Sequence, residues 1–272
     1  MCLRLYSFKE RFMRPFVIWF QHRSGSSHLV SLLNSHHDIY CKGEIFGCFR
    51  VGPSSEAKRN PNYKTLGENA FRRVINQFPG RIEDPDDKQC ANELDNFLFP
   101  TASPGETRVR GFKFKFPSQA TVFSEISEAL TARSHELNLI VLHRKDYLKR
   151  AISVINLERV QAIADKANVS EPIALPASTF DAQEVVRLMK YYREIQADFE
   201  NWANAFPNCF ELDYQDLNSD QKLTELQNFI GVGTKSLSSS TQKITPDDLS
   251  AHVSNLDEIM GAIKDAGLDQ ES

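Results

Sequence analysis

A short polar turn between two apolar segments holds the residues of this chain best suited to bind an anion. The turn contains one arginine, one glycine and three serines: Arg23, Ser24, Gly25, Ser26 and Ser27. Gly25 allows an anion to approach the backbone closely, the hydroxyls can donate hydrogen bonds, and a guanidinium group can donate two at once. A helix cap needs only one hydroxyl, so this composition favours a phosphate or sulfate site over a simple cap.

The segments on either side of the turn predict how it is positioned. Residues 16–20 favour a strand buried on both faces, and Leu29, Leu32 and Leu33 recur at helical spacing after the turn. A strand, a tight turn and a helix aim free backbone N–H groups and the positive end of a helix dipole at one point. The Gly-x-x-x-x-Gly-Lys-Ser/Thr motif of nucleoside triphosphatases is missing, and with it the lysine and Mg²⁺-binding hydroxyl of that motif.

Two further groups of residues lie near the ends of predicted strands. Arg144 directly follows the apolar strand 138–143, and Ser153 lies nine residues later on the next predicted helix. Lys113 belongs to segment 110–116, in which basic and aromatic residues alternate with the period of a strand. All three side chains could contact an anionic ligand. The simpler alternative, that they are solvated side chains without a ligand, stays open for both groups.

Strands and helices alternate along the rest of the chain. We expect helices at 66–78, 118–134, 147–161, 181–206, 220–230 and 256–266, a strand at 209–214, and irregular segments at 47–65, 81–108 and 163–180. This alternation predicts an α/β fold, a three-layer α/β/α arrangement around a mostly parallel central sheet with ligands at the carboxyl ends of its strands. We expect a single domain over residues 1–272, with loops at 47–108 and 163–180 facing the substrate and a C-terminal tail at 234–272.

Composition and charge exclude several classes of protein. A formal charge of −4 argues against a general nucleic-acid binder. The five cysteines are scattered and form no Cys-x-x-Cys pair, so we expect reduced thiols and a cytoplasmic location. No run of about eighteen apolar residues suggests a membrane span, and charged residues interrupt the first segment, so we expect no signal peptide. We also expect no metal site, because no cluster of metal-binding carboxylates is present.

Taken together, the motifs resemble those of the sulfotransferases that use 3′-phosphoadenosine 5′-phosphosulfate (PAPS). The similarity is closest to the bacterial carbohydrate branch, which modifies nodulation factors and trehalose glycolipids. Residues 22–29 look like the 5′-phosphosulfate loop of that family. Residues 34–39 and 43–46 resemble its "NSHPDI … GEIF" continuation, with His37 in place of proline.

Two later segments strengthen the resemblance, which runs from about Phe16 to Leu256. Residues 142–153 are similar to the 3′-phosphate motif, including the nine-residue step from arginine to serine found in this branch. Residues 211–217 resemble the "YEDL" strand, with Gln215 in place of glutamate. The resemblance implies a fold like that of the P-loop nucleotide hydrolases and transfer of a sulfuryl group from PAPS to an acceptor hydroxyl, with PAP (adenosine 3′,5′-bisphosphate) as the second product.

Carried over by position, the resemblance assigns roles to the candidate residues. The turn Arg23, Ser24, Gly25, Ser26 and Ser27 would hold the 5′-phosphosulfate, and Arg144 with Ser153 would hold the 3′-phosphate. Arg23 would also stabilise the charge that develops on the bridging oxygen during in-line attack. Glu44 occupies the position of the general base in the carbohydrate branch. The alternative for Glu44 is a loop carboxylate paired with Lys42 or Arg50.

Three more residues are candidates for contact with donor or acceptor. Lys113 matches a "GFK" strand of the family, and Lys243 could close over the 3′-phosphate. His28 departs from the family, which places an apolar or aromatic residue there, and is either a substrate contact or an ordinary residue of the first helical turn.

The expected partner is a small-molecule or carbohydrate acceptor, and the long segment 181–206 could serve a homodimer. A P-loop kinase and a non-catalytic nucleotide-binding protein of the same fold remain alternatives.

Overall fold

The main sheet of the protein consists of parallel strands. The computed structural model describes residues 14–51, 70–76, 80–100, 108–116, 123–164, 176–241 and 248–268. In sheet order the five strands are β2 (Ile39–Lys42), β6 (Val109–Phe116), β1 (Phe16–Gln21), β7 (Asn138–His143) and β8 (Cys209–Asp213). Every neighbouring pair in this sheet is parallel. The α/β fold with a parallel central sheet is therefore confirmed.

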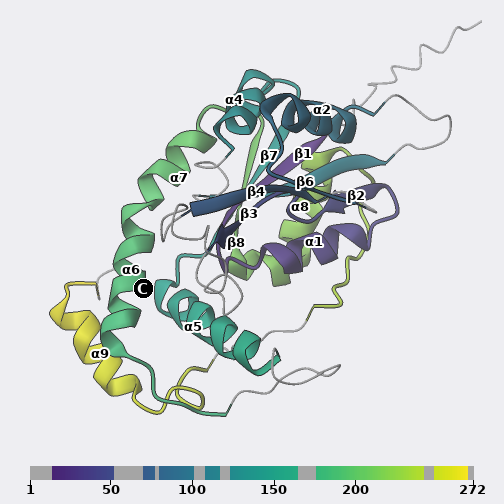
Figure 1. Cartoon of the computed structure of the whole chain (residues 1–272). Helices are drawn as coiled ribbons and strands as arrows, with labels where there is room; N and C mark the ends of the chain where they lie inside the picture. The colour runs from purple at the N-terminus through teal and green to yellow at the C-terminus, as the bar shows by residue number, and fades with distance from the viewer. Residues whose placement is uncertain are drawn as a thin grey trace, which may run out of the picture.

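Strand β1 lies at the centre of the sheet and is buried along its whole length. Successive side chains of a strand point to opposite faces, so β1 contributes to two separate apolar cores. On one face Phe16, Ile18 and Phe20 pack with residues of α1 (Ser26–Asn34) and α8 (Asp220–Ile230). The helix that the sequence predicts after the anion-binding turn therefore covers the sheet from this side (Figure 1).

Three helices cover the opposite face of the sheet. They are α2 (Asp87–Leu98), α4 (Ser124–Ala132) and α7 (Gln196–Ala203). Trp19 of β1 connects the sheet to this layer, because its ring stacks on Phe199 with centroids 5.7 Å apart and its Nε1 donates a hydrogen bond to the Phe199 carbonyl over 3.0 Å. The sheet lies between two helical layers, as the sequence predicts.

A third apolar core lies beside the sheet rather than on it. Helices α5 (Tyr147–Ala164), α6 (Ala182–Glu194) and α9 (Leu256–Asp265) pack together there (Figure 1). Helix α5 directly follows β7 and carries Ser153 in its second turn. This third core therefore fixes the helix that the sequence assigns to the anion site.

A small antiparallel sheet replaces two expected elements. It contains β3 (Phe46–Val51), β4 (Ala70–Asn76) and β5 (Arg81–Glu83). The helix expected at 66–78 and the irregular segment expected from residue 47 are therefore wrong where the structure describes them. The neighbouring residues Val74 and Ile75 are both buried, so β4 lacks the alternation that marks a half-exposed strand.

Three other expectations about helices were also inaccurate. Helix α2 lies within the expected irregular segment 81–108 and begins with a capping box between Asp86 and Gln89. The expected helix 181–206 is divided into α6 and α7 at Ile195. The helix expected from residue 118 begins at Ser124, and residues 117–122 lie outside the described part of the chain.

Helix α8, strand β8 and helix α9 agree with the sequence within one residue at each end. A short 3₁₀ helix, η3 (Tyr214–Asn218), follows β8. Among the described residues, no helix is both long and apolar enough to cross a membrane. The single domain and the homodimer stay predictions.

Candidate functional site

Each strand of the main sheet is associated with a side chain of the candidate site. Glu44 follows β2, Lys113 lies on β6, Arg23 follows β1, Arg144 follows β7 and Tyr214 follows β8. Because these strands are parallel, their carboxyl ends meet at one edge of the sheet. Sequence regions that lie far apart thus converge at one place.

The turn after β1 has a left-handed backbone at two positions. Arg23 has φ 61° and Gly25 has φ 89°. The conformation is unusual for an arginine and is expected only where surrounding contacts hold it. Gly25 precedes α1, and no described side chain caps this helix end. The first N–H groups of α1 are therefore open to a ligand, as an anion site requires.

Gly25 also has a packing role that sequence reasoning missed. A Cβ atom at this position would lie 2.5 Å from Cδ2 of Tyr214. The ring of Tyr214 thus covers the backbone of the turn from the side of β8. Glycine is required here by this close packing and by the positive φ, in addition to the close approach of an anion that the sequence suggested.

Arg23, Arg144 and Ser153 are brought together at this edge. Nε of Arg23 donates a hydrogen bond to Oγ of Ser153 over 2.9 Å, and Nη1 of Arg144 donates one to the carbonyl of Arg23 over 2.9 Å. The guanidinium carbon of Arg144 lies 4.5 Å from the ring centroid of Tyr214. The two segments that the sequence assigns to one ligand are in direct contact, while their role in binding stays a prediction.

The cluster is cationic and contains an unpaired polar atom. Burial, followed by the charge of Arg144, lowers the pKa of Arg23. None of the described carboxylates forms an ion pair with Arg23. Ser24 is 1% exposed, and its Oγ has no hydrogen-bond partner among the described residues. A bound anion would stabilise both the Arg23 guanidinium, which has no described carboxylate partner, and the unsatisfied hydroxyl of Ser24.

Glu44 and Lys113 lie on the other side of the turn. Nζ of Lys113 is 3.1 Å from Oγ of Ser27 and 3.3 Å from Oε1 of Glu44. Nζ of Lys115 lies 4.0 Å from the other oxygen of Glu44. The Lys113 side chain is only 12% exposed, so it is not a solvated surface lysine. Lys113 therefore links the turn to the candidate base.

The alternative partners considered for Glu44 were Lys42 and Arg50. The described ion pairs of Glu44 are with Lys113 and Lys115 instead of Lys42. The side chain of Arg50 lies outside the described residues. Nδ2 of Asn76 donates a hydrogen bond to the Glu44 carbonyl over 2.9 Å. Strand β4 thus fixes the backbone that carries the carboxylate.

The histidines near the site have different environments. Nδ1 of His28 lies 2.8 Å from Oγ1 of Thr241, so this side chain contacts the C-terminal tail. Burial, together with the charges of Lys115 and Arg23, lowers the pKa of His22 to about 4. His22 is therefore a neutral imidazole at pH 7. Lys243 lies outside the described residues.

A cavity of about 450 Å³ opens next to Arg144. It is lined by Arg144, Lys145, Asp146, Lys149, Asp213, Tyr214, Gln215 and Asp216. The three aspartates are already engaged, because each accepts a hydrogen bond from a backbone N–H group at the start of α5 or η3. The lining also contains cationic, amide and phenol groups, of which Lys149 forms an ion pair with Asp146. The cavity is large enough for a nucleoside.

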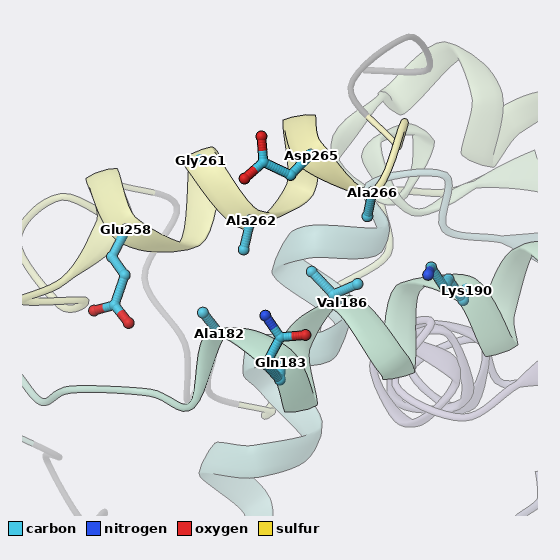
Figure 2. Close-up of a pocket in the computed structure, with 9 residues that line it drawn as sticks. All are labelled: Ala182, Gln183, Val186, Lys190, Glu258, Gly261, Ala262, Asp265 and Ala266. Carbon is cyan, nitrogen blue, oxygen red and sulfur yellow. The ribbon is translucent and has the colours of Figure 1, made fainter.

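A second cavity, of about 440 Å³, lies between α6 and α9. Figure 2 shows Ala182 and Val186 of α6 facing Ala262 of α9 across it. The residues of α6 that line this cavity lie on a different face of the helix from Tyr192. Tyr192 contacts Arg150, which lies beneath the turn after β1. This cavity therefore does not belong to the site.

One group of metal-ligand types, His36, His37 and Asp38, occurs among the described residues. Nδ1 of His36 accepts a hydrogen bond from the Asp38 N–H over 3.1 Å, so its Nε2 carries the proton and donates to the Gly233 carbonyl over 2.7 Å. Both ring nitrogens of His36 are thus engaged in hydrogen bonds.

A family model described as "Sulfotransferase family" matches residues 15–235. The structure is similar to the crystal structure of a sulfotransferase from Alicyclobacillus acidocaldarius, with a TM-score of 0.46 and 16% sequence identity. The match covers 95% of this chain and 97% of the other chain. The comparison with curated proteins finds no match. The family assignment depends on the match over residues 15–235.

Proposed function

This chain belongs to the sulfotransferase family, and we propose that it moves the sulfuryl group of PAPS to a hydroxyl group of a carbohydrate or glycolipid. The observation that carries the proposal is the contact between the turn after β1 and the start of α5 through Arg23, Arg144 and Ser153. PAPS has phosphate groups at both ends of its ribose, so its recognition needs two adjoining anion sites. PAPS supplies the activated sulfuryl group.

The residues present fit such a donor. The N–H groups at the start of α1 and the unpaired Oγ of Ser24 suit the 5′-phosphosulfate. Arg144 and Ser153 suit the 3′-phosphate, and the cavity beside Tyr214 suits the adenine base. No metal ion is required by this arrangement, because lysine and arginine side chains supply the positive charge.

Glu44 and Lys113 support an in-line displacement. In the proposed reaction the acceptor oxygen bonds to sulfur while the bond between sulfur and the 5′-phosphate oxygen breaks, and Glu44 takes the proton of the acceptor hydroxyl. Protonation of Glu44 would remove the negative partner of Lys113. The ammonium group beside Ser27 would then be available to the charge developing on the bridging oxygen.

The proposed acceptor class follows from the motif around Glu44. Residues 43–46 resemble the carbohydrate branch, and this segment leads from β2 into the small antiparallel sheet. In an α/β protein, segments inserted at the carboxyl edge of the sheet are where acceptor specificity arises. Residues 47–108 thus remain the proposed acceptor side.

Transfer of radiolabelled sulfate from PAPS to a panel of carbohydrates and glycolipids tests the proposal. We expect transfer to at least one acceptor and release of PAP. We also expect PAP to raise the melting temperature, whereas ATP with Mg²⁺ should change it little. Equal stabilisation by ATP would contradict recognition of the 3′-phosphate. PAP binding without transfer to any acceptor would favour a non-catalytic binding protein.

A further inference from the structure

Arg150 is a buried arginine directly beneath the turn after β1. It is 1% exposed, in the first turn of α5, and none of the described carboxylates pairs with it. Its Nε donates a hydrogen bond to the carbonyl of His22 over 2.8 Å, and its Nη1 donates one to Oε1 of Gln21. A buried cation without an acidic partner is costly, so its retention calls for a specific reason.

We propose that Arg150 is a positioning residue that holds the turn after β1 in the conformation needed to bind the 5′-phosphosulfate. This inference rests on the proposed function and adds a residue that the resemblance does not assign. Arg150 acts on the backbone of the turn from the side of α5. It does so through His22, which directly precedes the left-handed Arg23.

The geometry of the carbonyl groups supports this role. Arg150 binds the carbonyl of His22 and Arg144 binds that of Arg23, so two consecutive carbonyls are held by guanidinium groups. Rotation of either peptide group would break one of these charge-assisted hydrogen bonds. The carbonyl dipoles of His22 and Arg23 would repel an anion, and their hydrogen bonds to the two arginines hold them in place. The N–H groups at the start of α1 therefore remain available to the anion.

Arg150 is itself fixed by a neighbouring helix. Its guanidinium carbon lies 3.7 Å from the ring centroid of Tyr192 on α6. Tyr192 is buried, and it belongs to the third apolar core. Stacking of a guanidinium on an aromatic ring restricts its orientation. Arg150 thus transmits the position of α6 to the turn.

Affinities for two nucleotides distinguish a role of Arg150 in positioning the turn from a role in general stability. PAP carries phosphates at both ends of the ribose, whereas adenosine 3′-phosphate lacks the group that the turn would bind. We expect the preference of the wild-type protein for PAP over adenosine 3′-phosphate to fall about tenfold or more in Arg150→Met. Affinity for adenosine 3′-phosphate should change by no more than about twofold, because Arg144 and Ser153 remain. Both affinities are measured by calorimetry on the full chain.

Arg150→Lys is the second variant. It keeps the charge, but a single ammonium group cannot hold the two acceptors in the fixed geometry of a guanidinium. We therefore expect it to lose most of the preference as well. The matched control is Arg133→Met. Arg133 lies before the amino end of β7 and pairs with Asp95, so this variant should keep the preference for PAP.

Each outcome decides the inference. A preserved preference in Arg150→Lys would show that charge alone is needed and would overturn the positioning role. A preserved preference in both Arg150 variants would overturn it as well. If the wild-type protein itself does not prefer PAP, the proposed function fails and the inference fails with it. The wild-type titration therefore distinguishes the two failures.

Discussion

Nε of Arg23 donates a hydrogen bond to Oγ of Ser153 over 2.9 Å, although 130 residues separate them in the sequence. Arg23 belongs to the turn after β1 and Ser153 to α5, so the bond joins the two candidate anion-binding segments. The side chain of Arg144 adds a contact to the Arg23 carbonyl. The result is one cluster that contains Arg23, Arg144 and Ser153, which suits a ligand with two anionic groups.

Substitution of Arg144 tests the proposed 3′-phosphate contact. Arg144→Met should weaken PAP binding by roughly tenfold to a hundredfold, because a phosphate would lose its charge-assisted hydrogen bonds. Binding of adenosine 5′-phosphate should fall less, and only to the extent that the turn depends on the hydrogen bond from Arg144 to the Arg23 carbonyl. Calorimetric titration measures both affinities, with Arg133→Met as the control. An equal loss for both nucleotides would place Arg144 outside the 3′-phosphate site.

Substitution of Glu44 tests the proposed base. Glu44→Gln keeps the size of the side chain but cannot accept the acceptor proton as a carboxylate does. PAP affinity should stay within about twofold, and turnover should fall by roughly two to four orders of magnitude. Glu225→Gln, a surface glutamate that pairs with Lys222, is the matched control. Unchanged turnover in Glu44→Gln would remove Glu44 from the mechanism.

Substitution of two glycines distinguishes the cost of backbone strain from the cost of side-chain crowding. Gly231 has φ 92°, and no atom lies within 4 Å of where an added Cβ would be, so Gly231→Ala should cost about 1 kcal/mol in the free energy of unfolding. Gly25 has a similar φ but lies against Tyr214, so Gly25→Ala should cost more, on the order of 2–4 kcal/mol. Urea unfolding of the two variants checks this. Equal losses would mean that the Tyr214 ring moves aside freely.

Stability against pH tests the environment of His22. Burial lowers its pKa to about 4 from the ordinary value of 6.5. Between these values the unfolded chain binds a proton at His22 that the folded protein excludes, so stability is intact above pH 6.5 and falls as the pH falls through this window. This loss of stability should amount to about 2 kcal/mol after allowance for partial exposure. His22→Gln has no imidazole to protonate and should therefore not show it.

Urea unfolding at several pH values compares wild type, His22→Gln and His37→Gln. The side chain of His37 is 72% exposed, so its substitution serves as the control. The stability of His22→Gln should decline less steeply toward pH 4 than that of the other two proteins. Parallel declines in all three would show that the folded protein does not hold His22 neutral.

The main sheet could be predicted because its signals are local. β1 and β7 are mostly apolar and fully buried, and the turn at 23–27 shows its glycine and hydroxyls directly in the sequence. β4 could not be recognised, because its conformation depends on pairing with β3 and β5 rather than on its own periodicity. The capping box of Asp86 and Gln89 was a readable signal for α2 that was missed.

The site also contains residues with local sequence signals and residues whose role depends on tertiary packing. Arg23, Arg144 and Ser153 stand in motifs, so their proximity could be expected from the order of the strands. Tyr214 could not be assigned, because its contact with Gly25 crosses from β8 to β1 and depends on tertiary packing. Arg150 had one readable signal, since it precedes Ser153 by three residues and therefore shares a face of α5.

A crystal structure of the protein with PAP tests the central claim most directly. The account predicts the 5′-phosphate at the N–H groups of residues 24–27 and the 3′-phosphate within hydrogen-bond distance of Arg144 and Ser153. A nucleotide bound elsewhere, or with its 3′-phosphate in solvent away from Arg144, would contradict the account.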